Sequence, residues 1–190
     1  MDRNKMFTSK EIEQELNRVH YKEQYNKTFR STVCVLITVA AIAILVATLW
    51  LPVLRIYGSS MTPTLVDGQL IVSVKEAELE TGDIVAFYYN NKVLVKRVIA
   101  QERDWVDIDE EGNVTVNGKI LEEPYLEEKA LGECNIALPY QVPDGRIFVM
   151  GDHRSVSIDS RHSSLGCIAD EQIVGRLVLR IWPLKDITLL

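Results

Sequence analysis

The chain has 190 residues, of which 47% are hydrophobic and 25% charged, a composition that fits one ordinary domain with an appendage and excludes a disordered or collagen-like protein. Its 21 Lys/Arg against 27 Asp/Glu give a formal net charge of −6. Nucleic-acid binding needs clustered cations that displace counterions from phosphates, so this composition gives it no support.

The three cysteines are too few for a disulfide-dense scaffold and have no C-x-x-C spacing for zinc or redox chemistry. One intrachain disulfide, between Cys134 and Cys167, is kept as an alternative.

The charge is unevenly distributed along the chain. Residues 1–55 carry eight Lys/Arg against five Asp/Glu, whereas the remainder carries 13 against 22.

A long apolar segment covers residues 33–54, with the sequence VCVLITVAAIAILVATLWLPVL and no charge in 22 residues. A helix of this length, at about 1.5 Å per residue, crosses a hydrocarbon core of about 30 Å. A buried core helix would show a polar stripe. A cleaved signal peptide would have a shorter apolar region nearer the N-terminus. The segment therefore predicts one transmembrane anchor helix.

The flanking charges predict the orientation of this anchor. Lys22, Lys27 and Arg30 precede it and only Arg55 follows it closely, so the positive-inside rule places the N-terminus in the cytoplasm of a single-pass plasma-membrane protein. The expected segments are a cytoplasmic N-terminus at 1–32, the anchor at 33–54 and an extracytoplasmic domain at 55–190.

Beyond the anchor the apolar runs are short and rich in β-branched residues, which is typical of strands. Turn-forming residues separate the runs, and Asn117-Gly118 is the strongest hairpin signal. The pattern predicts a mainly β domain built from an antiparallel sheet or a barrel. The expected strands cover residues 70–74, 83–89, 93–99, 114–116, 146–150 and 173–182.

Two residues of this domain are candidates for chemistry. Ser60 lies in YGSSMTPTL, where Gly and Pro indicate a fixed turn, although a serine in such a loop is more often simply solvated. Lys96 lies in VLVKRVI, a run whose two strand faces are both apolar. Desolvation lowers the pKa of a lysine, which turns it into a general base near neutral pH. The alternative is that Lys96 and Arg97 reach water at a sheet edge.

A third polar cluster, GDHRSVSIDSR at residues 151–161, follows an expected strand. Taken by itself, this cluster has three interpretations. It is a loop whose side chains hydrogen-bond to its own backbone, a metal site, or the source of a base for Ser60. The base would be His153 or His162 in a Ser-His-Asp triad, although no G-x-S-x-G motif surrounds Ser60. A metal site would use Asp152, His153, Asp159 and His162. The spacing of these four residues fits no common metal-binding template.

The three segments, in this order behind an N-terminal anchor, resemble the motifs of type I signal peptidase, the bacterial leader peptidase that removes signal peptides from exported proteins. Residues 60–64 (SMTPT) resemble its nucleophile motif, residues 96–99 (KRVI) its lysine motif and residues 151–161 its third motif. The resemblance covers about residues 30–182, and the short domain is similar to the compact members of Gram-positive bacteria.

The resemblance implies a serine endopeptidase in which Ser60 is the nucleophile and Lys96 the general base, acting through an acyl-enzyme. It further implies that Ser157 orients the lysine and that Asp159 and Arg161 form a supporting ion pair. It implies neither a cofactor nor a metal. Contacts to the substrate or the oxyanion are expected from Gly58, Ser59 and Met61.

The sequence departs from the family pattern at three places. Gly58 stands where part of the family has a hydroxyl that contributes to the oxyanion hole, so the second oxyanion donor is left open. His153 stands where the family usually has Asn, and residues 100–104 replace a Gly-rich turn. None of these positions belongs to an expected reacting group.

The partners implied by the resemblance are pre-proteins that carry a signal peptide, which would pair as an added strand, together with the lipid bilayer and a nearby secretion translocon. No nucleic-acid partner is expected. The rival interpretation is a catalytically silent assembly factor for surface or exported proteins on the same fold. The presence of both Ser60 and Lys96 argues against it.

Overall fold

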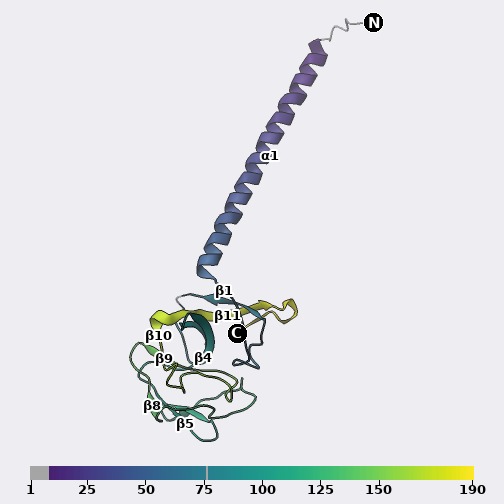
Figure 1. Cartoon of the computed structure of the whole chain (residues 1–190). Coiled ribbons are helices and arrows are strands. Elements are labelled where there is room, and N and C mark those ends of the chain that lie inside the picture. The colour runs from purple at the N-terminus through teal and green to yellow at the C-terminus, as the bar shows by residue number, and fades with distance from the viewer. Residues whose placement is uncertain (1–8, 76) are drawn as a thin grey trace. The chain divides into compact units, whose positions relative to one another are not determined.

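The computed structural model describes residues 9–75 and 77–190, and the chain divides into two compact units at Ala47 and Thr48. Helix α1 (Ser9–Trp50) is continuous over 42 residues (Figure 1). Its segment Leu16–Leu45 is long and apolar enough to cross a membrane. The helix begins well before the predicted anchor and ends before its last four residues. Pro52 explains this end, because a proline disfavours the helical conformation of the residue before it.

The second unit is mainly antiparallel β, which confirms the predicted fold class. Its larger sheet has the strand order β1-β2-β11-β3-β4-β9-β10, and β12 pairs with β11. The strands of this sheet are β1 (Val53–Arg55), β2 (Leu70–Val74), β3 (Ile84–Tyr89), β4 (Lys92–Ala100), β9 (Arg146–Met150), β10 (Ile168–Ala169), β11 (Ile173–Trp182) and β12 (Thr188–Leu189).

A smaller sheet has the order β7-β6-β5-β8. The hairpin predicted at Asn117-Gly118 joins β6 to β7, and both turn residues have positive φ, 53° and 74°, as a type I′ turn requires. The strands of this sheet are β5 (Trp105–Ile108), β6 (Val114–Val116), β7 (Lys119–Ile120) and β8 (Tyr140–Gln141), and two short 3₁₀ helices, η1 (Asp170–Gln172) and η2 (Leu184–Asp186), flank β11.

All six predicted strands are present, whereas the strands that the sequence did not reveal are short. Residues of both sheets share one buried apolar cluster that includes Ile99, Val106 and Phe148. A second cluster contains Met61 and Leu65. The segment that carries Ser60 is therefore anchored to the core of the larger sheet by apolar side chains on its C-terminal side.

The register of β4 positions the candidate residues. β4 pairs with β3 from Lys92 to Arg97, but with β9 only from Arg97 to Ala100. Residues 92–96 therefore have a strand partner on one side alone. Lys96 and Arg97 are nevertheless buried, with 4% and 7% of each residue exposed, so the interpretation that they reach water at an edge is wrong.

Candidate active site

The segment around Ser60 is a tight turn held by backbone hydrogen bonds. The Thr62 N–H donates to the Ser59 carbonyl at 3.1 Å and the Leu65 N–H to the Met61 carbonyl at 2.8 Å. The Gly58 N–H donates to Asp67 Oδ1 at 2.8 Å, with a φ of +86° that suits glycine. Ser60, which is half-buried, is thus presented from a conformation that its neighbours define.

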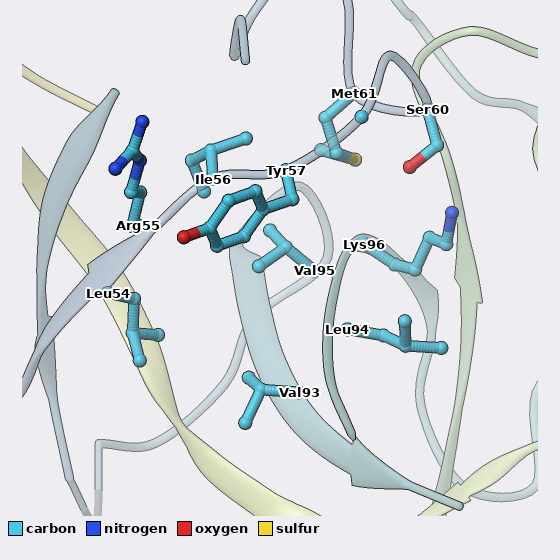
Figure 2. Close-up of a pocket in the computed structure, with 11 residues that line it drawn as sticks. Leu54, Arg55, Ile56, Tyr57, Ser60, Met61, Val93, Leu94, Val95 and Lys96 are labelled. Carbon is cyan, nitrogen blue, oxygen red and sulfur yellow. The ribbon is translucent and has the colours of Figure 1, made fainter. Parts of the chain in front are cut away.

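The Lys96 amine points toward Ser60, and both residues line the same hollow (Figure 2). The two side chains come from different elements, the turn after β1 and the middle of β4. Lys96 Nζ donates a hydrogen bond to Ser157 Oγ at 2.8 Å. Ser157 is itself buried. The structure therefore brings Lys96 into contact with Ser157, and Ser60 and Lys96 line one hollow.

Burial lowers the pKa of Lys96 from 10.5 to about 8, because desolvation disfavours the ammonium. Asp159 and Asp152 act in the opposite direction, while Arg161 adds to the lowering. A neutral amine that donates one N–H to Ser157 keeps its lone pair for another proton. The environment thus makes Lys96 a base at mildly alkaline pH.

Asp159 and Arg161 form the predicted ion pair, fully buried, with Arg161 Nε and Nη2 each 2.8 Å from a carboxylate oxygen. Although burial opposes ionisation, the guanidinium and the Gly151 N–H keep the pKa of Asp159 below its usual value. Arg161 also binds the Ser157 carbonyl at 3.3 Å. The pair therefore supports the loop that carries Ser157.

Gly151 is required by close packing at the centre of the site. A Cβ at this position would lie 2.2 Å from Ser157 Oγ and 2.5 Å from the Ser60 carbonyl oxygen. The end of β9 can therefore approach both residues only because it carries glycine. This explains a glycine at the start of the third motif.

A second buried ion pair, which the sequence did not reveal, lies beside the site. Arg97 contacts both oxygens of Asp152, at 2.9 and 2.6 Å, and Thr64 Oγ1 donates to Asp152 Oδ2 at 2.5 Å. The guanidinium also stacks 3.8 Å from the ring centre of Tyr125. This network ties β4, the Ser60 segment and the third motif together. The unusual Lys-Arg pair in an apolar strand was the signal that could have indicated it.

Two hollows meet at Lys96. The first, about 110 Å³, lies between the Ser60 segment and β4 and is lined by residues that include Tyr57, Gly58, Ser60, Met61 and Val95 (Figure 2). The second, about 430 Å³, is lined by Leu94, Val156 and Ile158, among others. Of the expected substrate contacts, Gly58 and Met61 line the first hollow, and exposed Ser59 is not among its lining residues.

The alternative chemistries considered for the third motif find no support in the described residues. His153 Nδ1 contacts Thr62 Oγ1, and His162 contacts Ser164 and Asn135, so neither ring is hydrogen-bonded to the Ser60 hydroxyl. Within residues 9–75 and 77–190 no group of three His, Cys, Asp or Glu side chains is placed to hold a metal ion. The three cysteines, Cys134 and Cys167 included, are free thiols.

Comparison with known proteins decides the family. Residues 29–182 match the family model described as signal peptidase, peptidase S26. The chain belongs to this signal peptidase family. Signal peptidase IB from Staphylococcus aureus strain COL is 38% identical over 152 residues, covering 69% of this chain and 78% of that protein. The match confirms the resemblance, including the likeness to compact Gram-positive members.

Two further relatives extend the comparison of this signal peptidase family member. The chloroplastic thylakoidal processing peptidase 1 of Arabidopsis thaliana is 36% identical over 143 residues, covering 66% of this chain and 40% of that protein. The crystal structure of a signal peptidase I from Enterococcus faecalis V583 is 26% identical in sequence. The structural alignment covers 53% of this chain and 97% of the Enterococcus faecalis chain, with a TM-score of 0.44.

Proposed function

We propose that this protein is a membrane-anchored signal peptidase I, a serine endopeptidase that cleaves signal peptides from exported pre-proteins with Ser60 as nucleophile and Lys96 as general base. The observation that carries this proposal is the buried Lys96 amine, which has a lowered pKa, is held by Ser157 and is directed at Ser60 (Figure 2). Family membership supports the substrate class.

In the acylation step, the neutral Lys96 amine takes the proton of the Ser60 hydroxyl while Oγ attacks the scissile carbonyl carbon. The resulting ammonium then gives its proton to the leaving amine as the C–N bond breaks. The new N-terminus of the mature protein departs, and the signal peptide remains as an ester on Ser60.

In the deacylation step, Lys96 takes a proton from a water molecule that attacks the ester. The tetrahedral intermediate collapses, the proton passes from Lys96 to Ser60 Oγ, and the signal peptide leaves as a carboxylic acid that then gives its proton to the solvent. The Ser60 N–H forms no hydrogen bond in the described structure and is free to stabilise the oxyanion. The Gly58 N–H is engaged by Asp67, which favours a substrate contact for Gly58 rather than an oxyanion contact.

The substrate is proposed to bind as an extended strand along the unpaired side of residues 92–96 of β4. An exposed strand edge offers backbone hydrogen bonds that add a peptide strand, and this edge lies beside Ser60 and both hollows. Alternate side chains of an extended peptide point to opposite faces. A small first hollow next to Ser60 suits a residue such as Ala before the cut.

Helix α1 is proposed to act as a single-pass anchor in the plasma membrane, with residues 1–32 in the cytoplasm and the catalytic domain outside. The length and apolar character of the helix and the positive flank before it support this topology. The bilayer and a nearby secretion translocon are the remaining proposed partners, because signal peptides emerge there.

The deciding experiment is cleavage of a peptide with an Ala-x-Ala junction by the detergent-solubilised wild type and by Ser60→Ala, with products identified by mass spectrometry. We expect a cut after the second Ala that disappears in Ser60→Ala. Lys96→Arg should be equally inactive, because a guanidinium stays protonated.

The rival assembly factor predicts a different result. If the folded wild type cleaves neither the peptide nor longer pre-proteins in lipid, the peptidase proposal fails and the silent assembly factor takes its place. No observation favours that rival.

A further inference from the structure

His153 lies where the parts of the proposed site meet. Its backbone N–H donates to the Ser60 carbonyl at 3.1 Å, and its own carbonyl accepts from the Ser157 N–H at 3.1 Å. These two bonds connect the turn that carries the nucleophile with the residue that holds the Lys96 amine. They involve only the backbone, so they do not explain why a histidine stands here.

The side chain of His153 adds a contact of its own. Nδ1 lies 3.0 Å from Thr62 Oγ1, while the Thr62 hydroxyl donates to the Ser59 carbonyl at 2.8 Å. A hydroxyl has a single hydrogen to donate. If that hydrogen goes to the Ser59 carbonyl, Thr62 Oγ1 accepts from His153, and the imidazole carries a proton on Nδ1.

We propose that His153 is a positioning residue that holds the Ser60 turn through a relay from His153 Nδ1–H to the Thr62 hydroxyl and on to the Ser59 carbonyl. The inference rests on the proposed peptidase function. The relay brackets the nucleophile, since Ser59 and Thr62 flank Ser60 on either side. The ring does not contact the Ser60 hydroxyl, so its role differs from that of a base.

The role predicts an effect on kcat rather than on KM. A nucleophile that is displaced by a fraction of an ångström loses rate steeply. His153 is absent from the lining of both hollows in which we place the substrate, so substrate binding should change little. We expect His153→Ala to lower kcat about tenfold, on the scale of one lost hydrogen bond, with KM within about twofold.

His153→Asn separates positioning from other roles. The amide nitrogen of Asn takes nearly the place of imidazole Nδ1 and donates a hydrogen bond, but an amide cannot act as a base. We expect this variant to restore kcat to within about twofold of wild type. Ser155→Ala, an exposed change in the same loop, is the matched control and should leave kcat unchanged.

Thr62 provides the test of the relay itself. Thr62→Val removes the hydroxyl and should lower kcat about as much as His153→Ala, while Thr62→Ser keeps the hydroxyl and the rate. If the two residues act through one relay, the double variant His153→Ala/Thr62→Val should be no slower than either single variant. Should His153→Ala fail to fold, the Thr62→Val and Thr62→Ser pair decides.

The experiment measures kcat and KM for the Ala-x-Ala peptide on the solubilised full chain, with Ser60→Ala as the blank and thermal unfolding as the check on folding. Failure of the peptidase function would appear as a wild type that does not cleave, or as a Ser60→Ala variant that does. With an active wild type, the positioning role is overturned if His153→Ala matches wild type or if His153→Asn is as slow as His153→Ala. It is also overturned if the two single effects multiply in the double variant.

Discussion

At the scale of single residues, the pKa of Lys96 determines how activity depends on pH. Since this pKa is about 8, the neutral amine should become tenfold more abundant per pH unit below 8 and saturate above it. We expect kcat/KM for a soluble peptide to rise accordingly between about pH 6 and 9, as measured by initial rates in detergent. A profile that is flat over this range would contradict a titrating lysine.

The same shifted pKa has a consequence for stability. Between about pH 8 and 10.5 the unfolded chain binds a proton at Lys96 that the folded chain does not bind, so stability rises with pH across this window. Near pH 7 the folded protein therefore bears the cost of a buried ammonium. We expect Lys96→Met to raise the free energy of unfolding at pH 7 by on the order of 2 kcal/mol.

Urea denaturation of Lys96→Met and wild type at several pH values would measure this gain. We expect the gain in the free energy of unfolding to shrink as the pH rises from 8 to 10.5. Over this range wild-type stability rises to the value of a chain that buries a neutral amine. A variant that is less stable than wild type at pH 7 would show that the Ser157 contact outweighs desolvation. Lys92→Met, an exposed change in the same strand, should have little effect.

At the scale of elements, the approach of β9 to the Ser60 turn depends on Gly151. The Cβ of an alanine would overlap the Ser60 carbonyl and Ser157 Oγ, so the strand end must move away. We expect Gly151→Ala to lower kcat about 100-fold, because the nucleophile and the residue that holds the base lose their alignment. Peptide cleavage per folded molecule would measure this.

Gly175→Ala is the matched control for that prediction. Its Cβ would lie 2.5 Å from the Val74 carbonyl oxygen, a comparable clash in the pairing of β11 with β2 and away from the site. Both variants should unfold at a lower temperature, but only Gly151→Ala should lose kcat. Equal losses of kcat would attribute the effect to stability rather than to alignment.

The ion pair of Arg97 with Asp152 joins β4 to the third motif. Arg97→Lys would lose the two-pronged contact and the stacking on Tyr125, although the charge is kept. We expect the free energy of unfolding in urea to fall by about 2 kcal/mol. Lys92→Arg, on an exposed position of the same strand, should change it by less than about 0.5 kcal/mol.

At the scale of the whole molecule, the division into two compact units predicts that catalysis and anchoring are separable. Residues 48–190 contain all the proposed catalytic residues and their buried partners. Without residues 1–47 we expect kcat/KM on a soluble peptide to stay within about threefold of the full chain. Cleavage of a pre-protein in lipid vesicles should fall at least tenfold, because the anchor raises the effective concentration at the bilayer.

Equal rates of the truncated and full-length chains on the pre-protein in vesicles would contradict an anchoring role for α1. Loss of activity on the soluble peptide as well would instead show that the helix is needed for the catalytic unit to fold. Thermal unfolding of the truncated chain distinguishes these cases.

The sequence by itself determined the apolar helix, the β class and the long strands, because each leaves a local pattern: an uncharged run or a short run of β-branched residues. Ser60 and Lys96 are proposed as the reacting residues from the resemblance of their segments to the family's motifs. The short strands β8, β10 and β12, of two residues each, leave no such pattern. The tertiary structure alone decided the contacts between distant segments. Lys96 and Ser157 are 61 residues apart, and Thr62 and His153 are 91 apart. Packing of the sheet, which no local pattern records, desolvates the lysine, pairs Arg97 with Asp152 and places His153 against the nucleophile turn.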